Sequence, residues 1–369
     1  MTHAERFKSA LRFKPVDKIP FSPGGPREST VARWKSDGMP GDSWQAALCE
    51  ALGLDLSEQK SFSMDVETKM RPTFEEKVLS HENGHYIVRD WMGAVTEISD
   101  RFDYTYIRTA KDFVTRKWHR FPVQTRAEWD DMRARYDSDD PARYAKIEAA
   151  PAPEGVLHTM AVNGPFWQMR EWMGFEGLCF AMADDPELVD EMALFWEEYV
   201  ARVLARALKS CKIDHIIVNE DMAYKAHSMI SPEMTKRYVI PSYRRWKKLI
   251  EASGSDCIFD IDSDGYVGTL IPLWIEADIH VNSPLEVAAH NDINAYRAAY
   301  GTEIAFRGGV DKRKIAAGGG ELRAEMKRLE PAVNAGGYIP GCDHGVPFDI
   351  SWQNFVDYCG ILARMTGWK

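Results

Sequence analysis

The chain has 369 residues, of which 45% are hydrophobic and 28% are charged, a composition typical of a folded globular protein. Its formal net charge of −10 argues against a nucleic-acid binder, because a protein that tracks phosphates needs a basic surface. No run approaches the roughly 18 apolar residues of a membrane span, and the charged start MTHAERFKSALRFK lacks a signal-peptide centre. We therefore expect a cytoplasmic protein without membrane partners.

The first 150 residues have an irregular pattern. Residues 85–98, HYIVRDWMGAVTEI, predict a hairpin around Gly93. Residues 125–137 predict a helix capped by Thr125, with Glu128 three residues later as in a capping box. We interpret residues 1–150 as an N-terminal helical cover with an excursion that carries the hairpin, joined to the rest of a single domain through the stretch EAAPAPEG.

From residue 151 to residue 369, short apolar strands alternate regularly with helices. The expected strands lie within residues 155–166, 213–221, 256–265, 277–286, 302–311 and 336–344. Repeated strand-helix units with nearly continuous apolar strands predict a parallel sheet and favour an α/β fold of the (β/α)₈ TIM-type barrel class. An open doubly wound sheet is the alternative, but no GxGxxG follows any of these strands.

Polar residues gather at the predicted strand ends, where the active site of such a barrel lies. Five of the six strand ends carry carboxylates. The side chains expected there are Asn163, Phe166, Glu220, Asp221, Lys225, Asp260, Asp262, Asp264, Asn282, Glu286, Arg307, Asp311, Cys342, Asp343 and His344. So many ionised acids would repel one another, so some must be protonated, paired with a base or bound to a cation.

Two of these strand ends offer a candidate metal site. Asp262 and Asp264 from one loop, with Cys342 and His344 from another, supply the oxygen, sulfur and nitrogen ligands that suit zinc. The alternative is that the two aspartates form a simple turn before Gly265, and that His344 is a hydrogen-bonded strand-end residue.

Glu220 is interpreted as an acid or ligand that faces the substrate. The alternative is a structural salt bridge with Lys225 or Arg307. Because Asp221 beside it must point the opposite way if the strand continues, one of the two faces the barrel mouth.

Aromatic and thioether residues follow the first of the regular strands, where the wall of an apolar pocket is expected. The candidate substrate-binding residues are Asn163, Phe166, Trp167 and Met169, together with Arg27 and Arg307. For most side chains of the segment GPFWQMREWMGF, plain core packing is the alternative.

Motifs along nearly the whole chain point to one superfamily. They are RFKSALRFKPVDKIPF, ESTVARWKSDGMP, FEEKVLSHENGHYIVRDWMGAVTE, FPVQTRAEWDDM, MGFEGLCFAMADDPELVDEM, NEDMAYKAHSMISPEM, DIDSDGYVGTLIPLWIEADIHVNSPLEV, RGGVDKRKIAAG and GGYIPGCDHGVPFDISWQNF. In this order they resemble the uroporphyrinogen decarboxylase superfamily, and more closely its branch of corrinoid-dependent methyltransferases. The resemblance implies a (β/α)₈ barrel, in agreement with the pattern.

The sequence departs from two motifs of that superfamily. The arginine-rich RQAGR motif of true uroporphyrinogen decarboxylases corresponds here to FSPGGPREST, whose only cation is Arg27, so decarboxylation of a porphyrinogen is disfavoured. The HxCG zinc ligands of the thiol-methylating members correspond to Asp262 and Asp264, whereas the later GC is kept as Gly341 and Cys342. Two carboxylates and a cysteine form a harder site, which suits a different substrate.

The resemblance and these departures together imply a methyltransferase. The expected reaction is O-demethylation, in which a methyl group passes from an aryl methyl ether, or from a methylated amine, to the cob(I)alamin of a separate corrinoid protein. The residues expected around the leaving oxygen are Glu220, Asp262, Asp264, Cys342 and His344, and a subset of them would hold any zinc.

Two other readings stay open. A decarboxylase or lyase of a small carboxylate would use Arg27 and Arg307 as anchors, with Asp262 or Asp264 as proton donor. An inactive relative that only binds a corrinoid protein is the third reading, and a twofold homodimer is the base-rate expectation for the assembly.

Overall fold

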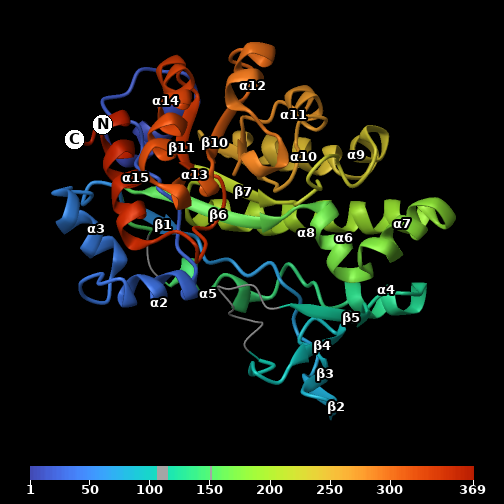
Figure 1. Ribbon diagram of the computed structural model, residues 1–369. Coiled ribbons are helices and arrows are strands. Elements are labelled where there is room, and N and C mark those ends of the chain that lie inside the picture. The colour runs from blue at the N-terminus through green and yellow to red at the C-terminus, as the bar shows by residue number, and fades with distance from the viewer. Residues whose placement is uncertain (106–114, 150–151) are drawn as a thin grey trace.

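A curled sheet of seven parallel strands forms the centre of the protein (Figure 1), as described by a computed structural model of residues 1–105, 115–149 and 152–369. In spatial order the strands are β1 (Ser61–Ser63), β6 (Leu157–Asn163), β7 (His215–Asn219), β8 (Ile258–Asp262), β9 (Val281–Ser283), β10 (Ala305–Val310) and β11 (Tyr338–Cys342). This order is also the order along the chain, as expected when crossover connections join successive strands.

Helices separate consecutive strands and cover the outside of the sheet (Figure 1). They are α6 (Pro165–Met173), α7 (Phe175–Asp184) and α8 (Pro186–Ser210) after β6, α9 (Pro232–Tyr238) and α10 (Ile240–Ala252) after β7, α11 (Ile271–Glu276) after β8, η3 (Val287–Ala289) and α12 (Ile293–Tyr300) after β9, α13 (Lys312–Ala317) and α14 (Gly319–Ala335) after β10, and α15 (Trp352–Met365) after β11. Side chains between these helices and the sheet form the main hydrophobic core.

An extended segment, residues 19–26, lies between β11 and the start of β1 and completes the ring. The Cys342 N–H donates to the Pro23 carbonyl oxygen at 3.4 Å, and Pro26 forms a parallel bridge with Val346. On the other side, the Phe21 N–H donates to the Gln59 side-chain oxygen at 2.7 Å. The predicted (β/α)₈ TIM-type barrel is confirmed, with this segment in the eighth position.

Helix α1 (His3–Leu11) closes the bottom of the barrel. Its apolar residues Phe7, Ala10 and Leu11 form a separate core with residues near the starts of the strands. Those strand residues are Leu157, Ile258, Val281, Ala305 and Ile339. Burying one large apolar side chain of this kind contributes about 1.5–3 kcal/mol. Because α1 closes the bottom, the barrel opens at the carboxyl ends of the strands.

The N-terminal excursion is a four-stranded antiparallel sheet that projects from the barrel (Figure 1). Its strands are β2 (Lys77–Glu82), β3 (His85–Arg89), β4 (Val95–Ser99) and β5 (Arg116–Arg120). The hairpin predicted around Gly93 is confirmed as β3–β4, where Val88 pairs with Thr96. The predicted Thr125 cap is also confirmed, because its hydroxyl accepts the Glu128 N–H at 3.3 Å.

The remaining elements of the first 150 residues cover the barrel from outside. They are α2 (Glu28–Ser36), α3 (Trp44–Leu52), α4 (Arg126–Arg133), η2 (Pro141–Arg143) and α5 (Ala145–Glu148). The division predicted at residue 150 assigned β1 and residues 19–26 to the N-terminal cover, whereas in the structure both belong to the barrel. Residues 150 and 151, where the junction was expected, lie outside the described residues. Among the described helices, none combines the length and the apolar character needed to cross a membrane.

Candidate active site

Three carboxylates converge at the barrel mouth and are called the acid group below: Asp221, Asp262 and Asp264. One oxygen from each lies within 4.8 Å of the others. Asp262 ends β8, two residues after the inward-facing Asp260, so strand alternation turns it into the barrel. Asp221 and Asp264 follow β7 and β8, and the Asp264 N–H donates to Asp221 Oδ1 at 3.2 Å. Asp262 and Asp264, the two carboxylates of the predicted metal site, are therefore joined by the carboxylate of Asp221.

The electrostatics of the acid group favour a proton or a cation among the three carboxylates. Burial, followed by the charges of Asp260, Asp264 and Asp221, raises the pKa of Asp262 to about 7. Burial and the charge of Asp264 also raise the pKa of Asp221. Asp221 has a φ of +42°, a left-handed conformation that is strained for a residue other than glycine and that occurs often at functional sites.

His344 connects the acid group to the N-terminal segment. Its Nε2 lies 3.0 Å from Asp264 Oδ2, and its Nδ1 lies 3.4 Å from Arg27 Nη2. The hydrogen bond to Asp264 is the main cause of a raised pKa for His344. The structure thus brings Asp262, Asp264, His344 and Arg27 together, as the sequence predicted, with His344 in a position to orient Asp264.

A buried polar network lies one layer below the acid group. Arg307 Nη1 donates to Asp260 Oδ2 at 2.5 Å, and His215 Nε2 lies 3.1 Å from the same oxygen. The Ser283 hydroxyl donates to Asp260 Oδ1 at 3.0 Å. Burial disfavours the ionised form of Asp260, but Arg307 and His215 outweigh burial and hold its pKa below the usual value. Arg307 is therefore largely committed to Asp260.

Glu220 faces away from the barrel mouth, toward the helix layer. It follows the alternation of Ile216 and Val218, which are buried in the outer core, and it is fully buried itself. Its Oε1 accepts the N–H groups of Phe166 at 2.6 Å and Trp167 at 3.3 Å, so the carboxyl group caps the N-terminus of α6.

The space beside Glu220 requires a glycine. A Cβ at Gly164 would lie 1.1 Å from Glu220 Oε2. Burial raises the pKa of Glu220 to about 8. Of the two adjacent acids, Asp221 is therefore the one at the mouth, and the geometry gives Glu220 a positioning role through α6.

Cys342 is separated from the acid group by the wall of the barrel. Its thiol is buried next to Tyr358 and Cys359 of α15, on the outer side of β11, and burial raises its pKa. Within the described residues, the three carboxylates form a metal-sized group that includes neither Cys342 nor His344. The structure therefore does not place the Cys342 thiol with the carboxylates that were predicted to bind the same metal.

The predicted aromatic wall divides into two parts. Phe166 and Met169 are fully buried in the core, as the packing alternative predicted. Trp167 is partly exposed, and its Nε1–H donates to Glu171 Oε1 at 2.9 Å. Asn163 ends β6, and its side-chain NH₂ lies 3.1 Å from Gln168 Oε1 and 3.4 Å from Glu171 Oε2.

Sequence reasoning did not select two polar residues of α6 near the mouth, Arg170 and Glu171. Arg170 Nη1 donates to the Asp221 carbonyl oxygen at 3.1 Å, and burial raises the pKa of Glu171. The signal available in the sequence was their position as the only charged residues of GPFWQMREWMGF, directly after a strand end.

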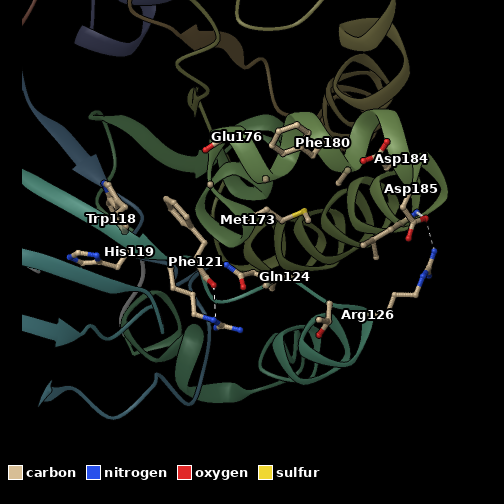
Figure 2. A pocket seen from close by; sticks show the side chains of 17 residues that line it. Trp118, His119, Phe121, Gln124, Arg126, Met173, Glu176, Phe180, Asp184 and Asp185 are labelled. Carbon is tan, nitrogen blue, oxygen red and sulfur yellow. Dashed lines mark hydrogen bonds and ion pairs between the residues drawn. The ribbon is translucent and has the colours of Figure 1, made fainter.

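A separate surface cavity lies between the end of β5 and α7 (Figure 2). It has a volume of about 590 Å³, and the exposed Phe180 lies along its rim. Figure 2 shows Trp118 and Phe121 at one end and the ion pair of Arg126 with Asp185 at the other. None of the three aspartates of the acid group lines this cavity, so we do not place the reaction there.

The acid group fits a divalent cation better than it fits a soft thiolate-type zinc site. Three carboxylates at this spacing supply hard oxygen ligands, and burial, together with the like charges that a cation would neutralise, raises the pKa values of Asp221 and Asp262. Zinc also accepts carboxylate oxygens. The expected sulfur ligand, Cys342, is buried on the other side of β11.

No family model matches the sequence, and no curated protein matches it significantly. Among solved structures, the chain is similar to a methyltransferase from Methanosarcina mazei, with a TM-score of 0.60, 13% sequence identity and coverage of 99% of both chains. It also matches a B12-independent methionine synthase from Shewanella sp. W3-18-1 in complex with selenomethionine, with a TM-score of 0.37, 15% identity and coverage of 62% of this chain and 64% of that one. At this level of identity, the first similarity establishes that the two proteins share a fold over their whole length.

Proposed function

We propose that the protein is a methyltransferase of the uroporphyrinogen decarboxylase superfamily that moves a methyl group from an aryl methyl ether to the cob(I)alamin of a corrinoid protein. The observation that carries the proposal is the acid group, three carboxylates at the mouth of a barrel whose fold is shared with a methyltransferase. In the reaction, the cobalt nucleophile attacks the methyl carbon, the carbon–oxygen bond breaks, and the phenolate oxygen leaves with the bonding electron pair and takes up a proton.

The leaving oxygen requires positive charge or a proton beside it. A divalent cation bound by Asp221, Asp262 and Asp264, zinc or an oxygen-preferring metal, would supply that charge. His344 orients Asp264 through the 3.0 Å contact, and Arg27 approaches the other ring nitrogen. Arg170 fixes the backbone at Asp221, which keeps that carboxylate turned toward the other two.

The test is methyl transfer by the purified protein. Methoxylated aromatics and methylamines are offered separately with free cob(I)alamin, and then with a corrinoid protein, and the visible spectrum is followed for formation of methylcobalamin. We expect conversion with the aryl ethers. Conversion with methylamines alone would replace the donor class, and no conversion with either class would refute methyl transfer.

Metal binding by the acid group can be tested without activity. We expect elemental analysis after dialysis against zinc or magnesium to give about one ion per chain for the wild type. Asp262→Ala and Asp221→Ala should lose most of that ion, because each removes one of three oxygen ligands. Cys342→Ala should retain it, since the thiol is buried behind β11.

Equal metal content in the wild type, Asp262→Ala and Asp221→Ala would remove the acid group as the site. Loss of the metal from a folded Cys342→Ala protein would instead support the ligand set predicted from the sequence.

A further inference from the structure

A second pocket lies between the four-stranded sheet and α6, and it is called the aromatic pocket below. Its volume is about 410 Å³, a size suited to one substituted aromatic ring. The ring walls are Trp118 and Phe121 from the excursion, with Trp167 and Phe175 from the barrel side. Trp118 and Phe121 stack with centroids 4.8 Å apart and planes at 13°, and this pair separates the pocket from the groove in Figure 2. Flat, apolar walls of this kind accept a planar ligand.

The aromatic pocket contains a buried guanidinium without a matching hydrogen-bond acceptor. Arg116 Nη1 is buried and has no hydrogen-bond partner in the described parts of the chain. An arginine stays protonated in a protein, and a buried charge is costly unless an anion pairs with it. The guanidinium also lies over the Trp118 ring, with its carbon 4.5 Å from the centroid, which fixes its place in the pocket wall.

Two carboxyl groups influence the charge of Arg116 without bonding to it. They are Asp90 and Glu171, and neither forms a hydrogen bond with Arg116 in the structure. Asp90 Oδ1 accepts the N–H groups of Met92 and Ala94, whereas its Oδ2 is buried without a hydrogen-bond partner in the described residues. Burial raises the pKa of both Asp90 and Glu171, which weakens each as a permanent anion. Arg116 is therefore free to pair with an anion supplied by a ligand.

The side chain of Arg170 contacts both the aromatic pocket and the backbone of Asp221 in the acid group. The Arg170 guanidinium carbon lies 5.0 Å from the Trp167 ring centroid, and its Nη1 donates to the Asp221 carbonyl oxygen at 3.1 Å. Arg170 also lines the pocket and adds a second positive charge to it. Arg170 therefore links the pocket to the backbone of the acid group.

We infer that the aromatic pocket binds a planar aromatic ligand that carries an anionic group, with the anion paired to Arg116. Under the proposed function, on which this step rests, the ligand is the methyl donor and the donor class is a methoxylated aromatic carboxylate. Aromatic walls also attract methylated ammonium groups. Glu171 also lines the pocket, but burial raises its pKa, and the two positive charges of Arg116 and Arg170 disfavour such a cation and distinguish the two donor classes.

Binding is measured on the purified full chain by calorimetry and by quenching of tryptophan fluorescence, with three probes of similar ring size: 4-methoxybenzoate, 4-methoxybenzyl alcohol and phenyltrimethylammonium. We expect the benzoate to bind at least about tenfold more tightly than the other two, because a charge-assisted hydrogen bond is roughly twice as strong as a neutral one. Arg116→Leu should lose that preference, and Arg116→Lys should retain part of it.

The matched control is Lys117→Leu, which removes a positive charge from the neighbouring residue of β5, whose side chain is 72% exposed. It should bind the benzoate like the wild type. Thermal unfolding of each variant checks the fold, and Arg116→Lys keeps the test valid if Arg116→Leu does not fold.

Three results would overturn the inference: equal binding of the benzoate and the alcohol, tightest binding of the ammonium probe, or an unchanged preference in Arg116→Leu. This experiment is independent of methyl transfer. Benzoate binding without methyl transfer would leave the pocket assigned and the proposed function refuted. Methyl transfer without a preference for the benzoate would support the proposed function and refute the assignment of the pocket.

Discussion

Asp262→Asn is expected to reduce methyl transfer by about 10²–10⁴-fold, the range for loss of a group that acts on a developing charge or a proton. Asp262 ends β8 inside the barrel, and its carboxylate belongs to the closest group of three acids that the structure describes. Asparagine keeps the size of the side chain but cannot carry its negative charge or its proton. The measurement is the rate of methylcobalamin formation from an aryl methyl ether at saturating donor.

Asp349→Asn is the matched control, since Asp349 is an exposed carboxylate in the loop after β11, at the same end of the barrel. Its rate should stay within about twofold of the wild type, because exposed substitutions away from a site have small effects. If Asp262→Asn also stayed within twofold, the acid group would have no part in the chemistry.

Glu220→Ala is expected to destabilise the fold by about 3–5 kcal/mol. The substitution leaves the buried N–H groups of Phe166 and Trp167 without an acceptor, at roughly 1–3 kcal/mol each, and opens a cavity. Glu220→Gln keeps an oxygen in the same position, so it should fold normally and retain most of the methyl-transfer activity. Urea unfolding of the three proteins measures the first effect, and the methylcobalamin assay measures the second.

The pH dependence of stability separates Glu220→Gln from the wild type. The pKa of Glu220 is about 8 in the folded protein, against an ordinary value of 4.5. Between these values the unfolded chain releases the proton and the folded chain keeps it, so this carboxyl group lowers wild-type stability as the pH rises from 4.5 to 8. Above pH 8 the loss is complete, and it amounts to roughly 5 kcal/mol for a shift of this size.

Glutamine has no such proton, so Glu220→Gln should match the wild type near pH 5 and exceed its stability at pH 8.5. Glu330→Gln, at an exposed residue of α14, should follow the wild-type curve from pH 5 to pH 8.5. Inactivity of a fully folded Glu220→Gln protein would return Glu220 to the catalytic residues predicted from the sequence.

Strand alternation explains which of the predicted site residues face the barrel interior and which do not. In β8, apolar and acidic residues alternate as Ile258, Asp260 and Asp262 on one face with Phe259 and Ile261 on the other, so the inward acids can be read from the sequence. In β11 every residue is buried and the pattern does not alternate, so the outward direction of Cys342 could not be predicted.

The remaining differences depend on contacts between distant parts of the chain. The strand β1 has only three residues, too few for a periodic signal, and its place is set by pairing of Ser61 with Leu157. The left-handed conformation of Asp221 turns its side chain toward Asp264, and no local motif predicts that turn. The aromatic pocket joins β5 to α6 across about fifty residues of sequence, so neither segment alone indicates it.

Phe121 attaches the four-stranded sheet to the barrel by packing on Gly174, where the backbone has a φ of +73° and a Cβ would lie 2.4 Å from the ring. The sheet contributes no strand to the barrel, yet it supplies one wall of the aromatic pocket. Ligand recognition and methyl-transfer chemistry would thus belong to separately variable pieces of the chain. Relatives that kept the three carboxylates but exchanged residues 77–120 could acquire new donors without rebuilding their catalytic residues.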